Sequence, residues 1–306
     1  MTDAPKHDAV LDCLIVGGGP AGLVAATYLA RFRRNIAVAD AGDSRALQIP
    51  VTYNCPGFPE GIAGRDLLAR LSDQVARYDV PIINSPVEAL SRAEKGTFAA
   101  RIGNATVQAR NVLLATGVID IAPDLPQVDE ALSRGALRLC PVCDGYEVSN
   151  RKVAVIGTSS HAVEEATFLK SFTEDVTLLA NDRDDLEPEV VERASARNIA
   201  VICDVEDMLA TRAGYQVLRA TQERVLFEAV YPALGCSIRS ELAGSLLVEL
   251  DEVGHIVVDR HQETSQPGVF AAGDVVHSLN QIAVAYGQAA TAATTIHNRL
   301  RDNGLF

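Results

Sequence analysis

The chain has 306 residues, of which 48% are hydrophobic, so it can bury a large core and is long enough for about two domains. Its formal net charge of −13 repels phosphate backbones, which argues against nucleic-acid binding. No segment reaches the roughly 18 uninterrupted apolar residues of a membrane span. The polar start of the chain lacks the apolar run of a signal peptide, and we therefore expect a cytoplasmic protein.

The first predicted elements are a strand, a glycine-rich turn and a helix. Residues 11–16 are an apolar run typical of a buried strand, and Gly-Gly-Gly-Pro-Ala-Gly follows at 17–22. Apolar residues then recur at helical spacing, and residues 36–39 predict a second strand. In such a unit the helix N-terminus binds a pyrophosphate and the acid after the second strand accepts hydrogen bonds from a ribose. The candidate cofactor-binding residues here are Gly17, Gly19, Pro20, Ala21, Gly22 and Asp40.

Each glycine of this turn has its own task. Gly17 permits the tight turn, Gly19 lets the backbone approach a pyrophosphate, and Gly22 allows close packing of helix against strand. The alternative is a glycine turn in some other α/β unit. The order of strand, glycines, helix, strand and acid favours a dinucleotide site over that alternative.

Later segments predict further strands and a long helix. Residues 87–109 indicate short alternating strands, and an apolar strand at 112–114 ends in Ala-Thr-Gly. Another apolar strand ends in the Gly-Asp pair at 273–274. An alanine-rich segment from Gln281 to Leu300 predicts a helix.

Two thiols lie between these segments. Cys140 and Cys143 are separated by two residues, so they can close a small disulfide and exchange it with a partner. Exchange passes through a mixed disulfide, and Asp144 is a nearby acid that can manage the proton of the leaving thiolate. The alternatives are half of a zinc site or two buried thiols. No second Cys-x-x-Cys and no paired histidines complete a metal shell, so the sequence predicts no metal site.

The chain resembles the low-molecular-weight thioredoxin reductase family of flavin-dependent disulfide reductases, from about residue 12 to residue 300. Besides the position of the thiols, the likeness rests on residues 54–59, which resemble the family's Asn-x-Pro-Gly-Phe segment, and on the strand at 268–274. The resemblance implies an α/β fold of two Rossmann-like dinucleotide-binding domains with three-layer ββα architecture, the second inserted into the first. It also implies a homodimer.

The resemblance sets the expected domain limits. Residues 1–118 and 235–306 are expected to form the FAD-binding domain. Residues 119–234 are expected to form an NAD(P)-binding-like domain that carries the Cys-x-x-Cys.

The resemblance also implies roles for individual residues. Cys143 would lie against the flavin and form the charge-transfer thiolate, Cys140 would attack the partner's disulfide, and Asp144 would be the general acid. Asn280 stands where the family usually has an arginine near the flavin, and Cys55 is interpreted as a small buried thiol. Further residues expected at the FAD are Asn54, Ala115, Thr116, Gly117, Gly273, Asp274, Gln281 and Ile282.

The second nucleotide site departs from the family pattern. A strand at 153–156 and a helix through Leu169 frame a turn in which Ser159 replaces a glycine, and its side chain obstructs a pyrophosphate. After the strand at 176–179 the family carries a basic cluster, but residues 180–185 here include three aspartates, which repel a 2′-phosphate. The sequence therefore argues against efficient NADPH use.

Other electron donors remain open at this point. Asp182 is placed to hold the unphosphorylated ribose of NADH, although Ser159 argues against NADH as well. If neither nicotinamide binds, the flavin exchanges electrons with ferredoxin, another flavin or molecular oxygen. His161 either fills the vacated nucleotide space, binds an anion, or serves in capping or packing of its helix. His277 either approaches the flavin or faces solvent.

The leading hypothesis is an FAD-dependent dithiol–disulfide oxidoreductase that acts on thioredoxin, a similar small redox protein, or a small dithiol or disulfide. One alternative is a flavin-dependent dithiol oxidase that passes electrons to oxygen. Another is a conventional NAD(P)H-dependent thioredoxin reductase. The last is a flavin-binding sensor without turnover, against which the intact Cys140, Cys143 and Asp144 argue.

Overall fold

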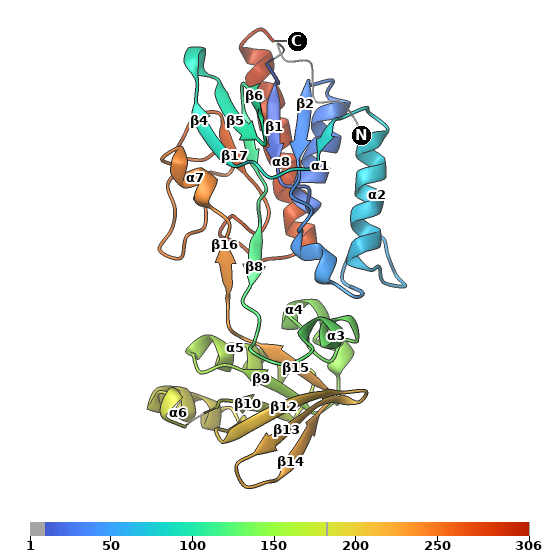
Figure 1. Cartoon of the computed structure of the whole chain (residues 1–306), viewed down its shortest axis with the longest axis vertical. Coiled ribbons are helices and arrows are strands. Elements are labelled where there is room, and N and C mark those ends of the chain that lie inside the picture. Colours follow the sequence, from blue (N-terminus) through green and yellow to red (C-terminus); the bar gives the residue numbers. More distant parts are fainter. Residues whose placement is uncertain (1–9, 182, 306) are drawn as a thin grey trace. The chain divides into compact units, whose positions relative to one another are not determined.

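A computed structural model describes residues 10–181 and 183–305, so the first nine residues, Asp182 and Phe306 lie outside the described residues. The chain divides into two compact units (Figure 1). Unit 1 comprises the described residues up to Leu47, then Gly64–Ile119, and the residues from Ser237 onward. Unit 2 comprises Gln48–Ala63 and Asp120–Cys236. The domain limits expected from the sequence stay a prediction.

A parallel sheet of five strands forms the centre of unit 1. Its strand order is β17-β7-β1-β2-β3, and every neighbouring pair is parallel. Strands β1 and β2 are buried at every position, as expected for a parallel sheet covered on both faces. The strands are β1 (Cys13–Val16), β2 (Ile36–Ala39), β3 (Ile82–Ile83), β7 (Val112–Leu114) and β17 (Val269–Ala271).

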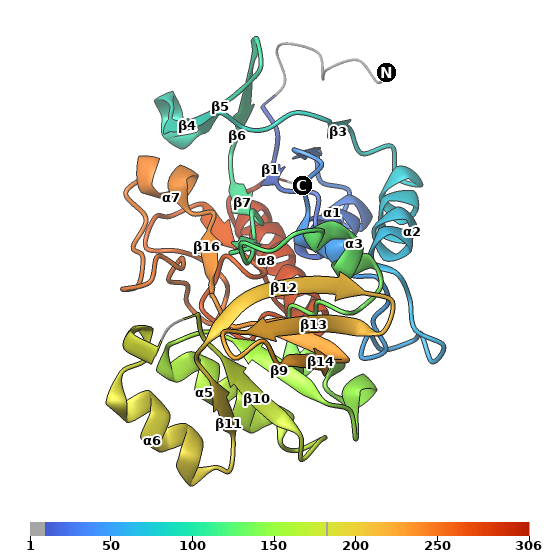
Figure 2. The same cartoon turned by 60° about the horizontal axis from the view of Figure 1, so that its bottom comes forward.

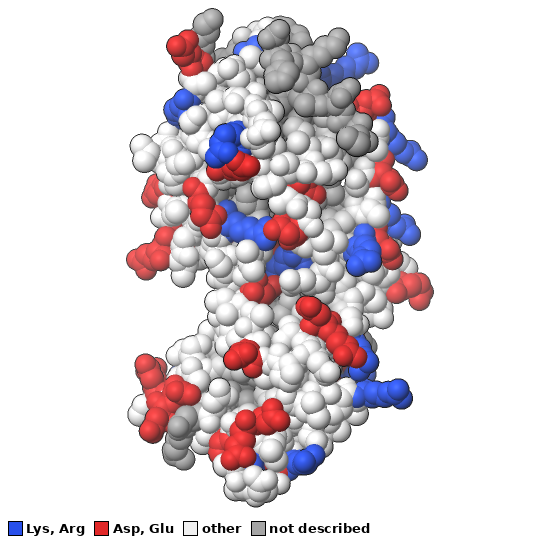
Figure 3. Space-filling view, in the orientation of Figure 1, with Lys and Arg blue, Asp and Glu red and all other residues white. Residues whose placement is uncertain are grey.

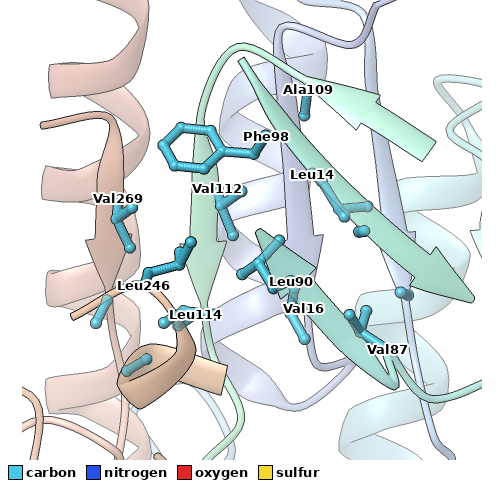
Figure 4. Packing of buried hydrophobic residues seen from close by; sticks show 14 of the residues in the cluster. Leu14, Val16, Val87, Leu90, Phe98, Ala109, Val112, Leu114, Leu246 and Val269 are labelled. Atoms are coloured by element: carbon cyan, nitrogen blue, oxygen red, sulfur yellow. The ribbon is translucent and has the colours of Figure 1, made fainter. Parts of the chain in front are cut away.

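An antiparallel sheet covers one face of this parallel sheet. It consists of β4 (Ala89–Arg92), β5 (Phe98–Ile102) and β6 (Ala105–Ala109), which confirms the alternating strands predicted at 87–109. Figure 4 shows the apolar layer between the two sheets, where Phe98 and Leu90 pack over the side chains of the parallel strands.

Helices cover the other face of the parallel sheet. They are α1 (Pro20–Arg31), α2 (Gly64–Ala76) and α8 (Ile282–Asp302), and α1 packs against the other two. The side of α8 that is buried carries mostly alanine, and these small side chains let α1 and α8 approach closely. The short helix α7 (Glu241–Ser245) packs near β4 instead.

Unit 2 repeats this layered arrangement (Figure 2). Its parallel sheet has the order β11-β10-β9-β15, and a three-stranded antiparallel sheet has the order β12-β13-β14. The parallel strands are β9 (Val153–Ile156), β10 (Val176–Leu179), β11 (Ala200–Ile202) and β15 (Ala229–Pro232). The antiparallel strands are β12 (Val205–Thr211), β13 (Gly214–Arg219) and β14 (Arg224–Phe227).

Side-chain alternation along β9 separates two cores in unit 2. Val153 and Val155 belong to the core that is shared with α5 (Ser160–Leu169) and α6 (Pro188–Ala196). Ala154 points the opposite way, into the core under the antiparallel sheet and α3 (Val128–Ser133). The remaining helix is α4 (Pro141–Asp144), and β8 (Val118–Asp120) pairs with β16 (Cys236–Ile238) where the chain passes between the units.

The predicted α/β fold is thus confirmed: each unit has a parallel sheet between helices and a smaller antiparallel sheet. Among the described residues, no helix combines the length and the apolarity needed to cross a membrane. On the face that Figure 3 shows, described basic side chains are interspersed with acidic ones.

Two adjacent leucines test the core of unit 1. Leu246 is 5% exposed and belongs to the layer between the sheets, whereas its neighbour Leu247 is 82% exposed. We expect Leu246→Ala to lower the free energy of unfolding by about 2–5 kcal/mol, because it leaves a cavity. Leu247→Ala should change it by less than about 0.5 kcal/mol. Urea denaturation followed by circular dichroism measures both, and equal effects would contradict this packing.

Candidate active site

The turn after β1 has no room for side chains. Gly17 has a φ of +111°, and a Cβ atom built on it would lie 2.2 Å from the backbone oxygen of Ala115. A Cβ on Gly22 would lie 1.9 Å from the backbone oxygen of Gly17. The ends of β1 and β7 and the start of α1 therefore meet backbone to backbone, as a dinucleotide turn requires.

The N-terminus of α1 is open toward an anion. Its N-cap is Gly19, which has no side chain to occupy the first amides, and Pro20 follows at the first helical position. The Asp40 carboxylate lies beside the turn, where its Oδ1 accepts the backbone N–H groups of Gly18 at 3.2 Å and Gly42 at 3.1 Å. These bonds fix the carboxylate at the end of β2.

The end of β17 reaches the same place. Gly273 has a φ of +86°, and a Cβ there would lie 3.0 Å from the Cβ of Ala21 in α1. Its N–H donates to Oε1 of Gln288 in α8 at 2.8 Å. The next residue, Asp274, forms an ion pair with Arg45 at 3.4 Å. The predicted Gly-Asp pair thus lies against the first turn of α1, and α8 starts nearby with Gln281 as N-cap and Ile282 as its first residue.

The segment after β7 forms hydrogen bonds with the segment after β16, where the chain re-enters unit 1. Thr116 donates through Oγ1 to the backbone oxygen of Arg239 at 2.6 Å, and Gly117 accepts the N–H of Arg239 at 3.1 Å. The Arg239 guanidinium in turn donates to both carboxylate oxygens of Asp43, at 2.9 and 2.8 Å. This bidentate pair was not predicted from the sequence. It holds the loop after β7 beside the loop after β2.

These residues fit an FAD. The glycines offer close backbone approach and open amides, and Asp40 stands where a ribose binds. Asn280, next to the N-terminus of α8, has a buried Oδ1 with no hydrogen-bond partner among the described residues. A buried acceptor of this kind is normally satisfied, and a donor on a bound cofactor would satisfy it.

One predicted flavin residue, Asn54, belongs to the other unit. Asn54 belongs to the segment Gln48–Ala63, which groups with unit 2, and its Oδ1 accepts a hydrogen bond from Thr52 Oγ1 at 2.8 Å. Its predicted role at the flavin stays a prediction. Cys55, beside it, is buried, and that burial raises the pKa of its thiol.

The two thiols of unit 2 form a disulfide. Cys140 and Cys143 are bonded, with 5.3 Å between their Cα atoms. Cys140 is the N-cap of α4, and its Sγ accepts the backbone N–H of Cys143 at 3.2 Å. After reduction, this donor stabilises a thiolate at Cys140 because an amide hydrogen bond favours the charged form.

Asp144 is held between a cation and a phenol. Arg138 donates to its Oδ2 at 2.9 Å, and the hydroxyl of Tyr231 donates to its Oδ1 at 2.9 Å. Burial raises the pKa of Asp144 above its ordinary value, and the opposing effects of Arg138 and Tyr231 do not cancel that rise. Burial also raises the pKa of Tyr231, so its hydroxyl keeps the proton that it donates. Asp144 is therefore a carboxyl group that retains its proton to a higher pH than a free aspartate.

Sequence reasoning missed Arg138 and Tyr231. Leu137 forms a parallel bridge with Val230, so the following residues of the two segments, Arg138 and Tyr231, lie side by side. The only signal in the sequence was a basic residue two positions before Cys140. The tyrosine lies 87 residues after Asp144, and nothing local connects the two.

The turn after β9 also joins a buried parallel strand to a helix through a glycine, but its N-cap residue differs from that of the first turn. A Cβ on Gly157 would lie 2.8 Å from the Cβ of Ala162 and 3.1 Å from the backbone oxygen of Ala233. Ser159, at the position of Gly19, is the N-cap of α5, and its Oγ accepts the N–H of Ala162 at 3.4 Å. The same N–H also donates to the backbone oxygen of Ser159 at 3.1 Å, and the serine side chain stands at the N-terminus of α5, where the first turn has only a glycine.

The surroundings of this turn are acidic. Asp184 and Asp185 are exposed in the loop after β10, while Asp182, the predicted NADH ligand, lies outside the described residues. His161 forms an ion pair with Glu165 one turn further along α5, at 3.1 Å, and this hydrogen bond raises the pKa of the histidine. His161 therefore pairs along its own helix.

Known proteins share both the sequence pattern and the fold. Residues 11–289 match the pyridine nucleotide-disulphide oxidoreductase family. The chain is 33% identical to a thioredoxin reductase of Mycolicibacterium smegmatis over 93% of this chain and 94% of that protein. It is 29% identical to a thioredoxin reductase of Helicobacter pylori over 96% of this chain and 100% of that protein.

A solved structure extends the likeness to the whole fold. The thioredoxin reductase of Streptococcus pyogenes superposes with a TM-score of 0.87 at 27% identity, covering 96% of this chain and 99% of that one. The chain therefore belongs to the pyridine nucleotide-disulphide oxidoreductase family and is a thioredoxin reductase-like, FAD-dependent disulfide oxidoreductase.

Proposed function

We propose that this enzyme exchanges electrons between its flavin and the disulfide of thioredoxin or a similar small redox protein, through Cys140 and Cys143, and that NADPH is not an efficient donor. The observation that carries the proposal is the Cys140–Cys143 disulfide beside a carboxyl group that is held by Arg138 and Tyr231. The thioredoxin reductase of Mycolicibacterium smegmatis, which matches this chain over nearly its full length, supports the choice of partner.

When bound, FAD would supply the two-electron redox chemistry by which the enzyme disulfide returns to the dithiol. The Cys140 thiolate attacks one sulfur of the partner's disulfide, which forms a mixed disulfide and releases the partner's other sulfur as a thiolate. The Cys143 thiolate then attacks the sulfur of Cys140, which restores the enzyme disulfide and releases the second thiolate of the partner. Two electrons pass to the partner, and its two thiolates take up two protons.

Asp144 is the proton donor in this proposal. A general acid is most effective when its pKa lies near the working pH, and burial moves the pKa of Asp144 in that direction. Arg138 and Tyr231 are positioning residues. Arg138 donates to one carboxylate oxygen of Asp144 and Tyr231 to the other, and the two come from neighbouring segments of unit 2. The N–H of Cys143 directed at Cys140 Sγ supports Cys140 as the attacking thiol.

The turn after β9 and the loop after β10 argue against NADPH. Ser159 caps α5 with its own side chain where the first site has Gly19 as the cap. Asp184 and Asp185 are exposed after β10, where a 2′-phosphate needs positive charge. These two features support another source of electrons, such as ferredoxin or another flavin. NADH is the second candidate, because an acid after this strand suits its unphosphorylated ribose.

Single-cysteine variants test the roles of the two thiols. With thioredoxin activated as a thionitrobenzoate mixed disulfide, we expect Cys143→Ser to form a stable adduct through Cys140 and Cys140→Ser to form none. Both variants should lose disulfide turnover by roughly 100-fold or more, since neither can complete the exchange. Mass spectrometry identifies the adduct, and Cys55→Ser is the control because its thiol is buried. Unchanged turnover in Cys140→Ser would refute the assignment.

The pH dependence tests Asp144. Only its protonated form donates, so turnover should fall as pH rises through its raised pKa, and Asp144→Asn should abolish that limb with a loss of roughly 100-fold. Tyr231→Phe removes a hydrogen bond that lowers this pKa, so the limb should move to higher pH. A hydrogen bond to a charged group contributes roughly 1.5–3 kcal/mol, so the shift should be large enough to measure.

Tyr215→Phe is the matched control for Tyr231→Phe. Tyr215 is a fully buried tyrosine of the same unit, and its hydroxyl has no hydrogen-bond partner among the described residues. Its removal should leave the pH profile unchanged. A limb that stays in place in Tyr231→Phe, or that moves equally in both variants, would exclude Asp144 as the titrating acid.

A further inference from the structure

Unit 1 contains a second cluster of ionisable side chains, away from the thiols in sequence. It consists of Asp251, His255 and His277, whose ligand atoms all lie within 4.8 Å of one another. Oδ2 of Asp251 lies 2.7 Å from Nδ1 of His277 and 3.3 Å from Nδ1 of His255. The two imidazole rings stand edge to face, with their centroids 5.3 Å apart.

The backbone fixes the first two members of the cluster. Residues 251–255 form a tight turn, closed by hydrogen bonds between the backbones of Asp251 and Gly254 and of Asp251 and His255. Oδ1 of Asp251 accepts the N–H groups of Val253 at 3.0 Å and His255 at 2.9 Å. One carboxylate oxygen is therefore committed to the turn, and the other is directed at the histidines.

The third member comes from the segment after β17. Ile256 forms a parallel bridge with Val276, and its N–H donates to the backbone oxygen of Val275 at 2.9 Å. This pairing places His277 opposite the turn. Asp251 and His255 are 22% and 17% exposed, whereas His277 is 73% exposed. The cluster is thus held by backbone pairing and is open to solvent on the His277 side.

We propose that these three residues bind one late first-row divalent cation, with Zn²⁺ as the ion that suits them best. Two imidazoles and one carboxylate are a donor set that such ions prefer. Ligand atoms at about 2.0–2.1 Å from a tetrahedral zinc are separated by roughly 3.3 Å. The separation of 3.3 Å from Asp251 to His255 matches this spacing, the one of 2.7 Å to His277 is shorter, and all three ligand atoms lie within 4.8 Å of one another, so a small movement of the exposed His277 would complete the site.

The cation has a structural consequence for the flavin cradle. His277 follows Asp274 by three residues, on the segment that also carries Gly273. A metal bound by His277 and by the turn at 251–255 would restrict the motion of the segment that carries Gly273 and Asp274. The sequence predicts no metal site, since it shows no second Cys-x-x-Cys and no paired histidines. His255 and His277 are 22 residues apart, and the pairing of Ile256 with Val276 brings their segments together.

The test uses the full chain without a histidine tag, with the disulfide oxidised and bound metal removed by a chelator. Titration with Zn²⁺ by calorimetry, and with Co²⁺ by its visible ligand-field absorption, should show one site per chain. We expect His277→Asn and Asp251→Asn each to weaken binding by about tenfold or more. His277→Asn alters an exposed side chain, and Asp251→Asn keeps an acceptor for the turn, so both variants should fold.

His261→Ala is the matched control, because this histidine is exposed on a neighbouring turn of the same unit. It should bind Zn²⁺ as tightly as the parent chain. Thermal unfolding gives a second readout: one equivalent of Zn²⁺ should raise the melting temperature of the parent and of His261→Ala, but not that of His277→Asn. Less than one equivalent of bound metal, or equal affinity in the parent and in both cluster variants, would overturn the proposal.

Discussion

The structure depends on turns in which a strand passes into a helix with no space for a side chain. In unit 1, Gly17 and Gly22 bring the ends of β1, β7 and α1 into backbone contact. In unit 2, Gly157 performs the same task against Ala162 and Ala233. Because the carboxyl ends of the parallel strands converge at these turns, the residues that follow β2, β7 and β17 gather around the first of them. The flavin cradle is a consequence of this packing.

The two turns share a frame and differ in what they offer a ligand. The first helix has Gly19 as its N-cap and no side chain over its first amides, whereas the second has Ser159 as its N-cap, whose hydroxyl accepts the N–H of Ala162. The two turns thus differ at the N-cap of the helix that follows, which is a glycine in unit 1 and a serine in unit 2. The disulfide, Asp144 and its two partners are meanwhile fully assembled.

The sequence could predict whatever depends on local pattern. Apolar runs marked the parallel strands, glycines marked the first turn, and the spacing of Cys140 and Cys143 indicated their disulfide chemistry. It could not predict contacts made by pairing of distant strands. Tyr231 reaches Asp144 because β15 pairs with β9 and Val230 bridges to Leu137, and His277 reaches Asp251 because Val276 bridges to Ile256. The environment that raises the pKa of Asp144 arises from that pairing.

We propose that electrons reach the flavin without efficient use of NADPH. Anaerobic titration of the purified flavoprotein with NADPH, then NADH, then dithionite, with the flavin spectrum recorded throughout, tests it most directly. We expect slow or absent bleaching by NADPH and complete bleaching by dithionite. Ser159→Gly, titrated in parallel, should be reduced faster by nicotinamide because it removes a side chain from the N-terminus of α5, where a pyrophosphate needs close backbone approach. Fast and complete bleaching of the parent by micromolar NADPH would contradict the account.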